Sequence, residues 1–167
     1  MSKLTALALS IAVLGGVWAV LALNPLAVVA LVWVGFIAWG CYFHTGGDGA
    51  ALQKTIAGMS FGAILAGVAL YLVSSGTLGG LGALAAPLII AVTVFPLVAV
   101  AGFNLLSTVP ANVYGYAATA GLALTAGTAA NVTAADFSNP VLLVIVSTVI
   151  GAIFGLLSGK LAGVLGK

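Results

Sequence analysis

Apolar runs of about 20 residues follow one another along the chain, and short polar or glycine- and proline-containing stretches separate them. The runs do not alternate apolar with polar residues, so they favour helices over the strands of a membrane barrel. Runs of this length are typical of transmembrane helices, because a helix satisfies its own backbone hydrogen bonds in lipid. We therefore predict an all-α, polytopic membrane protein with one integral-membrane domain over residues 1–167.

Six spans are predicted from the residues that interrupt the apolar runs. The residue before a proline leaves the helical region, so Asn24-Pro25 ends one span, and glycine-rich turns such as residues 44–49 end others. The first run is longer than the 7–15 apolar residues usual in a signal peptide, so we interpret it as a retained span. The predicted spans cover residues 4–23, 26–43, 51–73, 82–101, 110–129 and 139–164.

Composition excludes a water-soluble domain and gives the orientation of the spans. The chain is 63% hydrophobic and 4% charged, whereas a soluble surface needs roughly a quarter of charged residues. With six spans, one side of the membrane holds all four lysines, which are Lys3, Lys54, Lys160 and Lys167. Lysines collect on the cytoplasmic side, so we predict that both termini lie in the cytoplasm and Asp136 outside.

Few residue types are present that could support other functions. The single cysteine, Cys41, excludes an intrachain disulfide framework, and one His and two Asp leave little material for a metal site. We expect no metal, no cofactor and no nucleic-acid partner. Without a nucleophile constellation or cofactor motif, we do not expect an enzyme.

The fifth predicted span carries a polar face. Asn112, Tyr116 and Thr119 lie at i, i+4 and i+7 and therefore share one side of a helix. Placing a polar group in hydrocarbon without a hydrogen-bond partner costs a free energy of roughly several kcal/mol. Such a face therefore turns toward protein or water. Two interpretations stay open, an interhelical hydrogen-bond seam and a lining for a polar solute.

Further residues join this candidate pore or solute site. Polar side chains precede the fifth span, and aromatic side chains with helical spacing lie within the second. They are Asn104, Ser107, Thr108, Phe36, Trp39 and Phe43. Should the second and fifth spans face each other, aromatic walls with a few hydrogen-bonding groups result, as in most small-molecule sites. Core packing or lipid contact is the alternative for the aromatics.

Two other residue groups have weaker interpretations. His44 and Asp48 lie at the inner end of the second span, where a pH sensor or gate competes with an ordinary interfacial histidine. Small residues spaced four apart allow close helix packing in lipid. These helix-packing candidates are Gly58, Gly62, Gly151, Gly155 and Gly159.

Two short sequence matches suggest an inverted repeat of three plus three spans. Residues 33–40 align with 110–117, which pairs Trp39 with Tyr116, and residues 61–67 align with 150–156, where Gly-Ala-Ile recurs. Such repeats are an architecture of channels and transporters. Chance is the alternative, because these residue types are common in membrane helices.

The segments WVGFIAWGCYFHTGGDG and VPANVYGYA resemble a family of small bacterial six-helix inner-membrane proteins of the YcdZ type. The resemblance covers most of the chain by length and span count, and it implies a fold but no activity. The chain is also similar in size to the urea/amide channels and the acetate–succinate permeases, although it lacks the permease Asn-Pro-Ala-Pro motif.

Two functions follow as hypotheses. The first is a homo-oligomeric channel or facilitator for a small neutral or weakly charged solute such as urea, a short amide or a weak acid. No charge is predicted deep in a span, which disfavours ion-coupled transport. The second is an accessory or structural subunit that docks a partner through glycine-rich helix faces.

Overall fold

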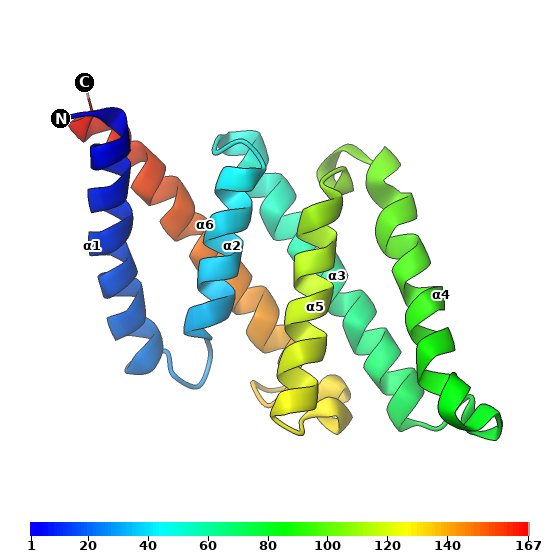
Figure 1. Ribbon diagram of the computed structural model, residues 1–167. Coiled ribbons are helices and arrows are strands. Elements are labelled where there is room, and N and C mark those ends of the chain that lie inside the picture. The colour runs from blue at the N-terminus through cyan, green and yellow to red at the C-terminus, as the bar shows by residue number, and fades with distance from the viewer. Residues whose placement is uncertain (167) are drawn as a thin grey trace. The chain divides into compact units, whose positions relative to one another are not determined.

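The computed structural model describes residues 1–166 and is all α-helical, as the sequence predicts (Figure 1). Its six α-helices are α1 (Lys3–Leu23), α2 (Val32–His44), α3 (Gly49–Ser74), α4 (Ala85–Ala99), α5 (Val109–Thr125) and α6 (Pro140–Leu165). Short 3-10 helices occupy the connections, at Gly79–Leu84, Val100–Gly102, Asn104–Leu106 and Ala129–Thr133. Lys167, one of the lysines used to predict orientation, lies outside the described residues.

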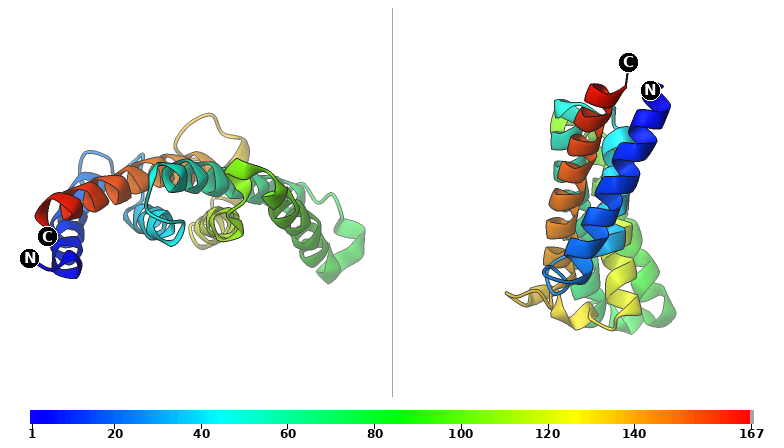
Figure 2. Two further views of the ribbon diagram at one scale, coloured as in Figure 1. Left: turned by 90° about the horizontal axis from the view of Figure 1, so that it is seen from above. Right: turned by 90° about the vertical axis from the view of Figure 1, so that its left-hand side faces the viewer.

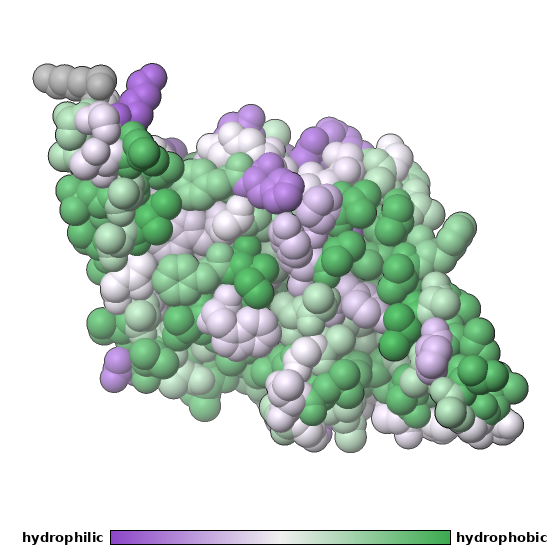
Figure 3. Space-filling model, in the orientation of Figure 1, coloured by the Kyte–Doolittle hydropathy of each residue, from purple (hydrophilic) through white to green (hydrophobic). Residues whose placement is uncertain are grey.

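Four helical segments are long and apolar enough to cross a membrane, namely Lys3–Leu23, Gly49–Ser74, Gly79–Gly102 and Pro140–Leu165. The surface is also suited to contact with lipid. The visible sides of α1 and of α4 are mainly hydrophobic (Figure 3). Val20 on α1 is 62% exposed and Phe95 on α4 is 75% exposed. These segments support a membrane protein.

The two remaining helices are short. α2 has 13 residues and α5 has 17, so at 1.5 Å per residue they extend roughly 20 and 26 Å. The predicted second span begins too early, since α2 starts at Val32 and not at Leu26. Residues 24–31 instead form turns held by backbone hydrogen bonds, and the Leu31 N–H that precedes α2 donates to Ser147 Oγ at 2.8 Å.

Two other predicted boundaries also shift. The fifth span was expected to reach Ala129, but α5 ends at Thr125 and is followed by Gly127 with φ +68°. This left-handed conformation favours glycine and stops the helix. The fourth span is an α-helix only from Ala85, because Gly82 (φ +54°, ψ −127°) breaks the preceding 3-10 turn.

The chain forms two compact units, which are described separately. Unit 1 contains Met1–Ile56 and Val146–Lys167, and unit 2 contains Ala57–Ile145. α3 and α6 each contribute residues to both.

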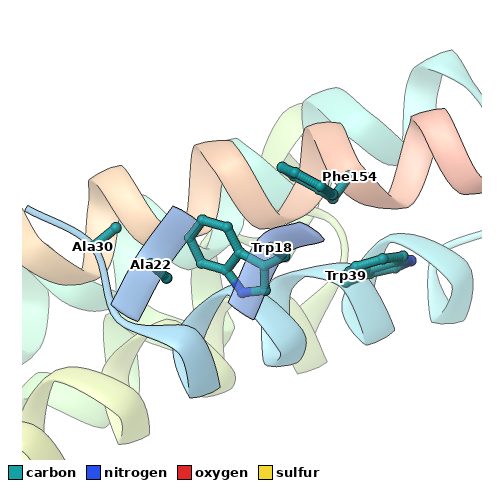
Figure 4. Packing of buried hydrophobic residues seen from close by; sticks show 5 residues of the cluster. All are labelled: Trp18, Ala22, Ala30, Trp39 and Phe154. Atoms are coloured by element: carbon teal, nitrogen blue, oxygen red, sulfur yellow. The ribbon is translucent and has the colours of Figure 1, made fainter. Parts of the chain in front are cut away.

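Unit 1 is built around an aromatic core. Trp18 of α1 and Trp39 of α2 each lie within 6 Å of the Phe154 ring of α6, with centroid distances of 5.6 and 5.8 Å (Figure 4). The indole of Trp18 lies against Gly35, where an added Cβ would come within 2.5 Å of the ring. Gly35 is therefore what allows α1 and α2 to pack this closely.

Glycines also bring helix backbones together in each unit. In unit 1, a Cβ added at Gly151 of α6 would collide with the Gly35 carbonyl of α2. In unit 2, a Cβ added at Gly62 of α3 would collide with the Asn112 carbonyl of α5, and one at Gly115 with the Met59 carbonyl. In lipid such close packing stabilises helix pairs, because hydrophobic exclusion does not act between them.

We expect Gly62→Ala and Gly151→Ala each to destabilise the protein by about 1–3 kcal/mol, because the new methyl overpacks a backbone contact. Thermal unfolding of the purified protein in detergent would measure this loss. Gly16→Ala on α1 is the matched control, because nothing lies within 4 Å of its added Cβ. Equal melting temperatures for all three variants would contradict the importance of these contacts.

Candidate functional site

Asn112, at the start of α5, links three elements of unit 2. Its side chain is 0% exposed, and its Nδ2 donates to the carbonyls of Leu97 (3.0 Å) and Leu106 (3.1 Å). Leu97 lies in the last turn of α4, where carbonyls lack an intrahelical partner, and Leu106 ends the 3-10 helix Asn104–Leu106. Because both carbonyls are acceptors, the amide atom that faces them must be the NH₂ group, which fixes the orientation of the amide. Asn112 therefore holds the α4–α5 connection together.

The acceptor side of the same amide has a different environment. Asn112 Oδ1 is buried and has no hydrogen-bond partner in the structure. It faces Gly58 of α3, where an added Cβ would lie 2.7 Å from it. An unsatisfied buried polar atom costs roughly 1–3 kcal/mol, and such atoms in native proteins usually have an explanation.

The next two residues of the polar face differ from each other. Tyr116 is partly buried, and its hydroxyl lies 2.9 Å from Thr93 Oγ1 of α4. Thr93 Oγ1 also donates to the Ile89 carbonyl at 2.9 Å, so Tyr116 is the donor toward Thr93. Thr119, one turn further along α5, is 0% exposed, and its Oγ1 has no partner. The face thus alternates between interhelical bonds and unsatisfied atoms.

The polar residues before α5 do not join this buried row. Asn104 and Ser107 are exposed, and Ser107 Oγ donates to the Asn104 carbonyl at 2.8 Å within the connecting turn. Thr108 is half-buried, and its carbonyl accepts from the N–H groups of Ala111 and Asn112 as α5 begins. Their predicted contact with a solute stays a prediction.

The candidate aromatic residues belong to unit 1. The Phe36 and Trp39 rings are stacked with centroids 5.7 Å apart, and Phe36 is 42% exposed. Trp39 is buried, and its Nε1 donates to Ser158 Oγ of α6 at 2.9 Å. Phe43 is half-buried and meets Tyr42 edge-on. Trp39 thus has core packing and a satisfied indole, whereas the expectation that the second and fifth spans face each other stays a prediction.

The residues predicted as a gate lie at the α2–α3 turn. Both His44 and Asp48 are exposed. Asp48 Oδ1 accepts the Ala51 N–H at 2.7 Å, so this carboxylate caps the start of α3. Capping accounts for Asp48 at this position, and nothing in the turn tests a pH response.

Sequence reasoning missed the partners of the polar face. Thr93 lies near the middle of an otherwise apolar fourth span, and its position gave no indication of Tyr116. The Leu97 and Leu106 carbonyls belong to the backbone and have no sequence signal. Thr148 of α6, in unit 1, was also missed, although it is fully buried with an unpartnered Oγ1. The only signal in the sequence was a threonine among the small residues of α6.

Two further features limit what this region can bind. Among residues 1–166, no cluster of three or more His, Cys, Asp or Glu side chains could hold a metal ion. A groove of about 310 Å³ on unit 2 is lined partly by Ile64, Tyr71 and Asn139, and it does not include the polar face of α5. Asn112 and Thr119 are both 0% exposed, so this groove does not reach them.

We expect Asn112→Leu to destabilise the protein by about 1–2 kcal/mol, because it leaves the Leu97 and Leu106 carbonyls without their donor. Thr119→Val removes a hydroxyl without a partner and keeps the side-chain shape, so it should leave stability unchanged or slightly raise it. Chemical or thermal unfolding in one detergent compares the two variants. A large loss of stability in Thr119→Val would reveal a hydrogen bond that the structure lacks.

Comparison with known proteins gives the family. No curated protein and no solved structure matches the chain. A family model described as "Protein of unknown function (DUF1097)" matches residues 8–163, nearly the whole chain. The predicted resemblance to a family of unknown function is confirmed. The chain belongs to the DUF1097 family.

Proposed function

We propose that this protein is a channel or facilitator for a small neutral or weakly charged solute, such as urea, a short amide or a weak acid. The observation that carries the proposal is the pair of unsatisfied acceptors on one face of α5, Asn112 Oδ1 and Thr119 Oγ1. Both side chains are 0% exposed. A transient hydrogen bond to a passing amide or hydroxyl would repay the cost of burying these atoms.

The short helices α2 and α5 support the same function. α2 starts at Val32 and α5 at Val109, 77 residues later, which is the offset of the sequence match between these spans. A pair of unusually short segments in corresponding positions of two halves is the best sequence-level indication of a transporter binding site. The polar face lies on one member of this pair.

The glycine contacts support a repeat of three plus three spans. Gly62 meets the Asn112 carbonyl, and Gly151 meets the Gly35 carbonyl. The two sequence matches pair Gly62 with Gly151 and Gly35 with Asn112, so the contacts correspond although the offsets differ. α3 and α6 also have equal lengths of 26 residues. With three spans in each half, the halves would have opposite orientations in the membrane.

In this proposal, the protein lies in the bacterial inner membrane, crosses it six times and has both termini in the cytoplasm. Ionisable side chains do not interrupt the middle of the long helices, since Lys54 and Lys160 lie near the start of α3 and the end of α6. This distribution suits a neutral solute, because ion coupling needs charge within the membrane. Self-association into a homo-oligomer belongs to the same proposal.

The packing of the glycines gives little support to the alternative, an accessory subunit that docks a partner. Gly58, Gly62, Gly151 and Gly155 all have side chains or backbone within van der Waals reach of an added Cβ. Their helix faces are therefore already covered by neighbouring helices within each unit and are not free for a partner. Gly159 is packed less tightly, because an added Cβ would lie 3.8 Å from Tyr42 and Phe43, an ordinary van der Waals contact.

Solute flux into proteoliposomes tests the transport proposal. We expect stopped-flow light scattering to show faster entry of urea or acetamide with the protein than in protein-free liposomes. Thr119→Val should slow this entry about five-fold, since one hydrogen bond is worth about 1 kcal/mol. Thr125→Val is the matched control, because Thr125 lies on the same helix, is exposed and bonds its own Gly121 carbonyl.

Two outcomes would count against transport. Flux equal to that of protein-free liposomes for urea, amides and weak acids would remove the proposal. Equal slowing by Thr119→Val and Thr125→Val would show that the buried hydroxyl has no special role.

Cysteine accessibility tests the six-span topology separately. In a Cys41→Ser background, we expect Ser138→Cys to react with an impermeant maleimide on intact spheroplasts, because the α5–α6 connection faces outward in this topology. Ser2→Cys should react only after permeabilisation. The reverse pattern, or labelling of both cysteines from outside, would contradict the orientation.

A further inference from the structure

We propose that unit 1 carries a binding site for an anionic phospholipid, at the groove between the start of α1 and the end of α6. The groove has a volume of about 470 Å³, which lies within the range of roughly 300–1,000 Å³ typical of small-molecule sites. No step of the proposed solute transport uses this region.

The groove is made by two helix ends that meet. The last turns of α6 lie beside the first turn of α1 (Figures 1 and 2). A Cβ added at Gly166 would lie 3.2 Å from the Lys3 Cα, so the two backbones nearly touch at the groove's end. Below this contact in Figure 1, α1 and α6 diverge.

The body of the groove is apolar and smooth. Leu7 of α1 and Phe43 of α2 form its walls, and Gly159, Ala162 and Gly163 of α6 form its floor. Nothing lies within 4 Å of a Cβ added at Gly163, so no side chain of the described residues fills the space there. Such a surface accommodates an acyl chain, because a flexible chain gains contact without displacing any side chain.

The charge at the groove selects the headgroup. Lys3 is the one ionisable side chain among the described lining residues, and neither Asp48 nor Asp136 lines the groove. Within residues 1–166, no carboxylate side chain that lines the groove neutralises this ammonium. A lysine beside an interhelical groove at a membrane surface attracts an anionic headgroup, and contributes about 1 kcal/mol toward it. An apolar groove that ends in a cation matches a phospholipid whose headgroup carries a net negative charge.

Lipid adduct counting by native mass spectrometry tests the site. The full-length protein, delipidated in detergent, is mixed with phosphatidylglycerol or with phosphatidylcholine. We expect tighter binding of phosphatidylglycerol, and Lys3→Gln should weaken that binding about five-fold while leaving phosphatidylcholine unchanged. Lys54→Gln is the matched control, because Lys54 belongs to unit 1 but does not line the groove.

A second variant tests the acyl-chain part of the site. Gly163→Leu should fill the groove and reduce adducts of both lipids. Gly16→Leu on α1 is the matched control, because an added Cβ also meets nothing within 4 Å there but Gly16 does not line the groove. Circular dichroism and gel filtration check that each variant folds. Unchanged phosphatidylglycerol binding in both Lys3→Gln and Gly163→Leu would overturn the proposal. Displacement of the lipid by millimolar inorganic phosphate would overturn it too, because it would show an anion site that does not need the acyl chain.

Discussion

The close approach of helix backbones at glycines is the constraint on which the rest of the structure depends. In lipid, association between helices comes from packing, so the distance between two backbones sets how much contact they make. At Gly62, α3 comes so near to α5 that the Asn112 carbonyl lies where a Cβ would be. This fixes the depth and rotation of α5, and with them the direction of every polar side chain on its buried face. Gly151 has the same effect on α2 in unit 1, where it meets Gly35.

Fixing α5 in this way divides its polar groups into two kinds. The amide donor of Asn112 satisfies two backbone carbonyls, and Tyr116 bonds Thr93, so these contacts hold α5 to α4 and its connection. The acceptor oxygen of Asn112 and the hydroxyl of Thr119 are buried and make no hydrogen bond. Both kinds lie on one helix face, which explains why a seam and a solute lining looked like rival interpretations. A single face can serve both purposes, with the Asn112 amide N–H groups and the Tyr116 hydroxyl used for structure and the unpartnered Asn112 Oδ1 and Thr119 hydroxyl left for a solute.

Much of the fold follows from the sequence, because lipid imposes a strong and simple rule on apolar runs. Helix type, helix number and most boundaries are predictable from the runs and their breakers, and the starts of α3, α5 and α6 fall within two residues of expectation. The start of α2 is not predictable, since Leu26 to Leu31 are apolar. One partner of this segment, Ser147, which accepts the Leu31 N–H, is more than a hundred residues away in the sequence. The polar face of the site is predictable from its spacing. Its partners are not, because two are backbone carbonyls and Thr93 approaches only through packing.

The central claim is that the unsatisfied acceptors of α5 serve a hydrogen-bonding molecule. A cryo-EM map of the protein in lipid nanodiscs, recorded with and without a high concentration of urea, tests this claim most directly. The account predicts ordered density, from water or urea, within about 3.2 Å of Asn112 Oδ1 or Thr119 Oγ1. A well-resolved map in which both atoms contact only carbon, in either condition and in every class of particles, would contradict it.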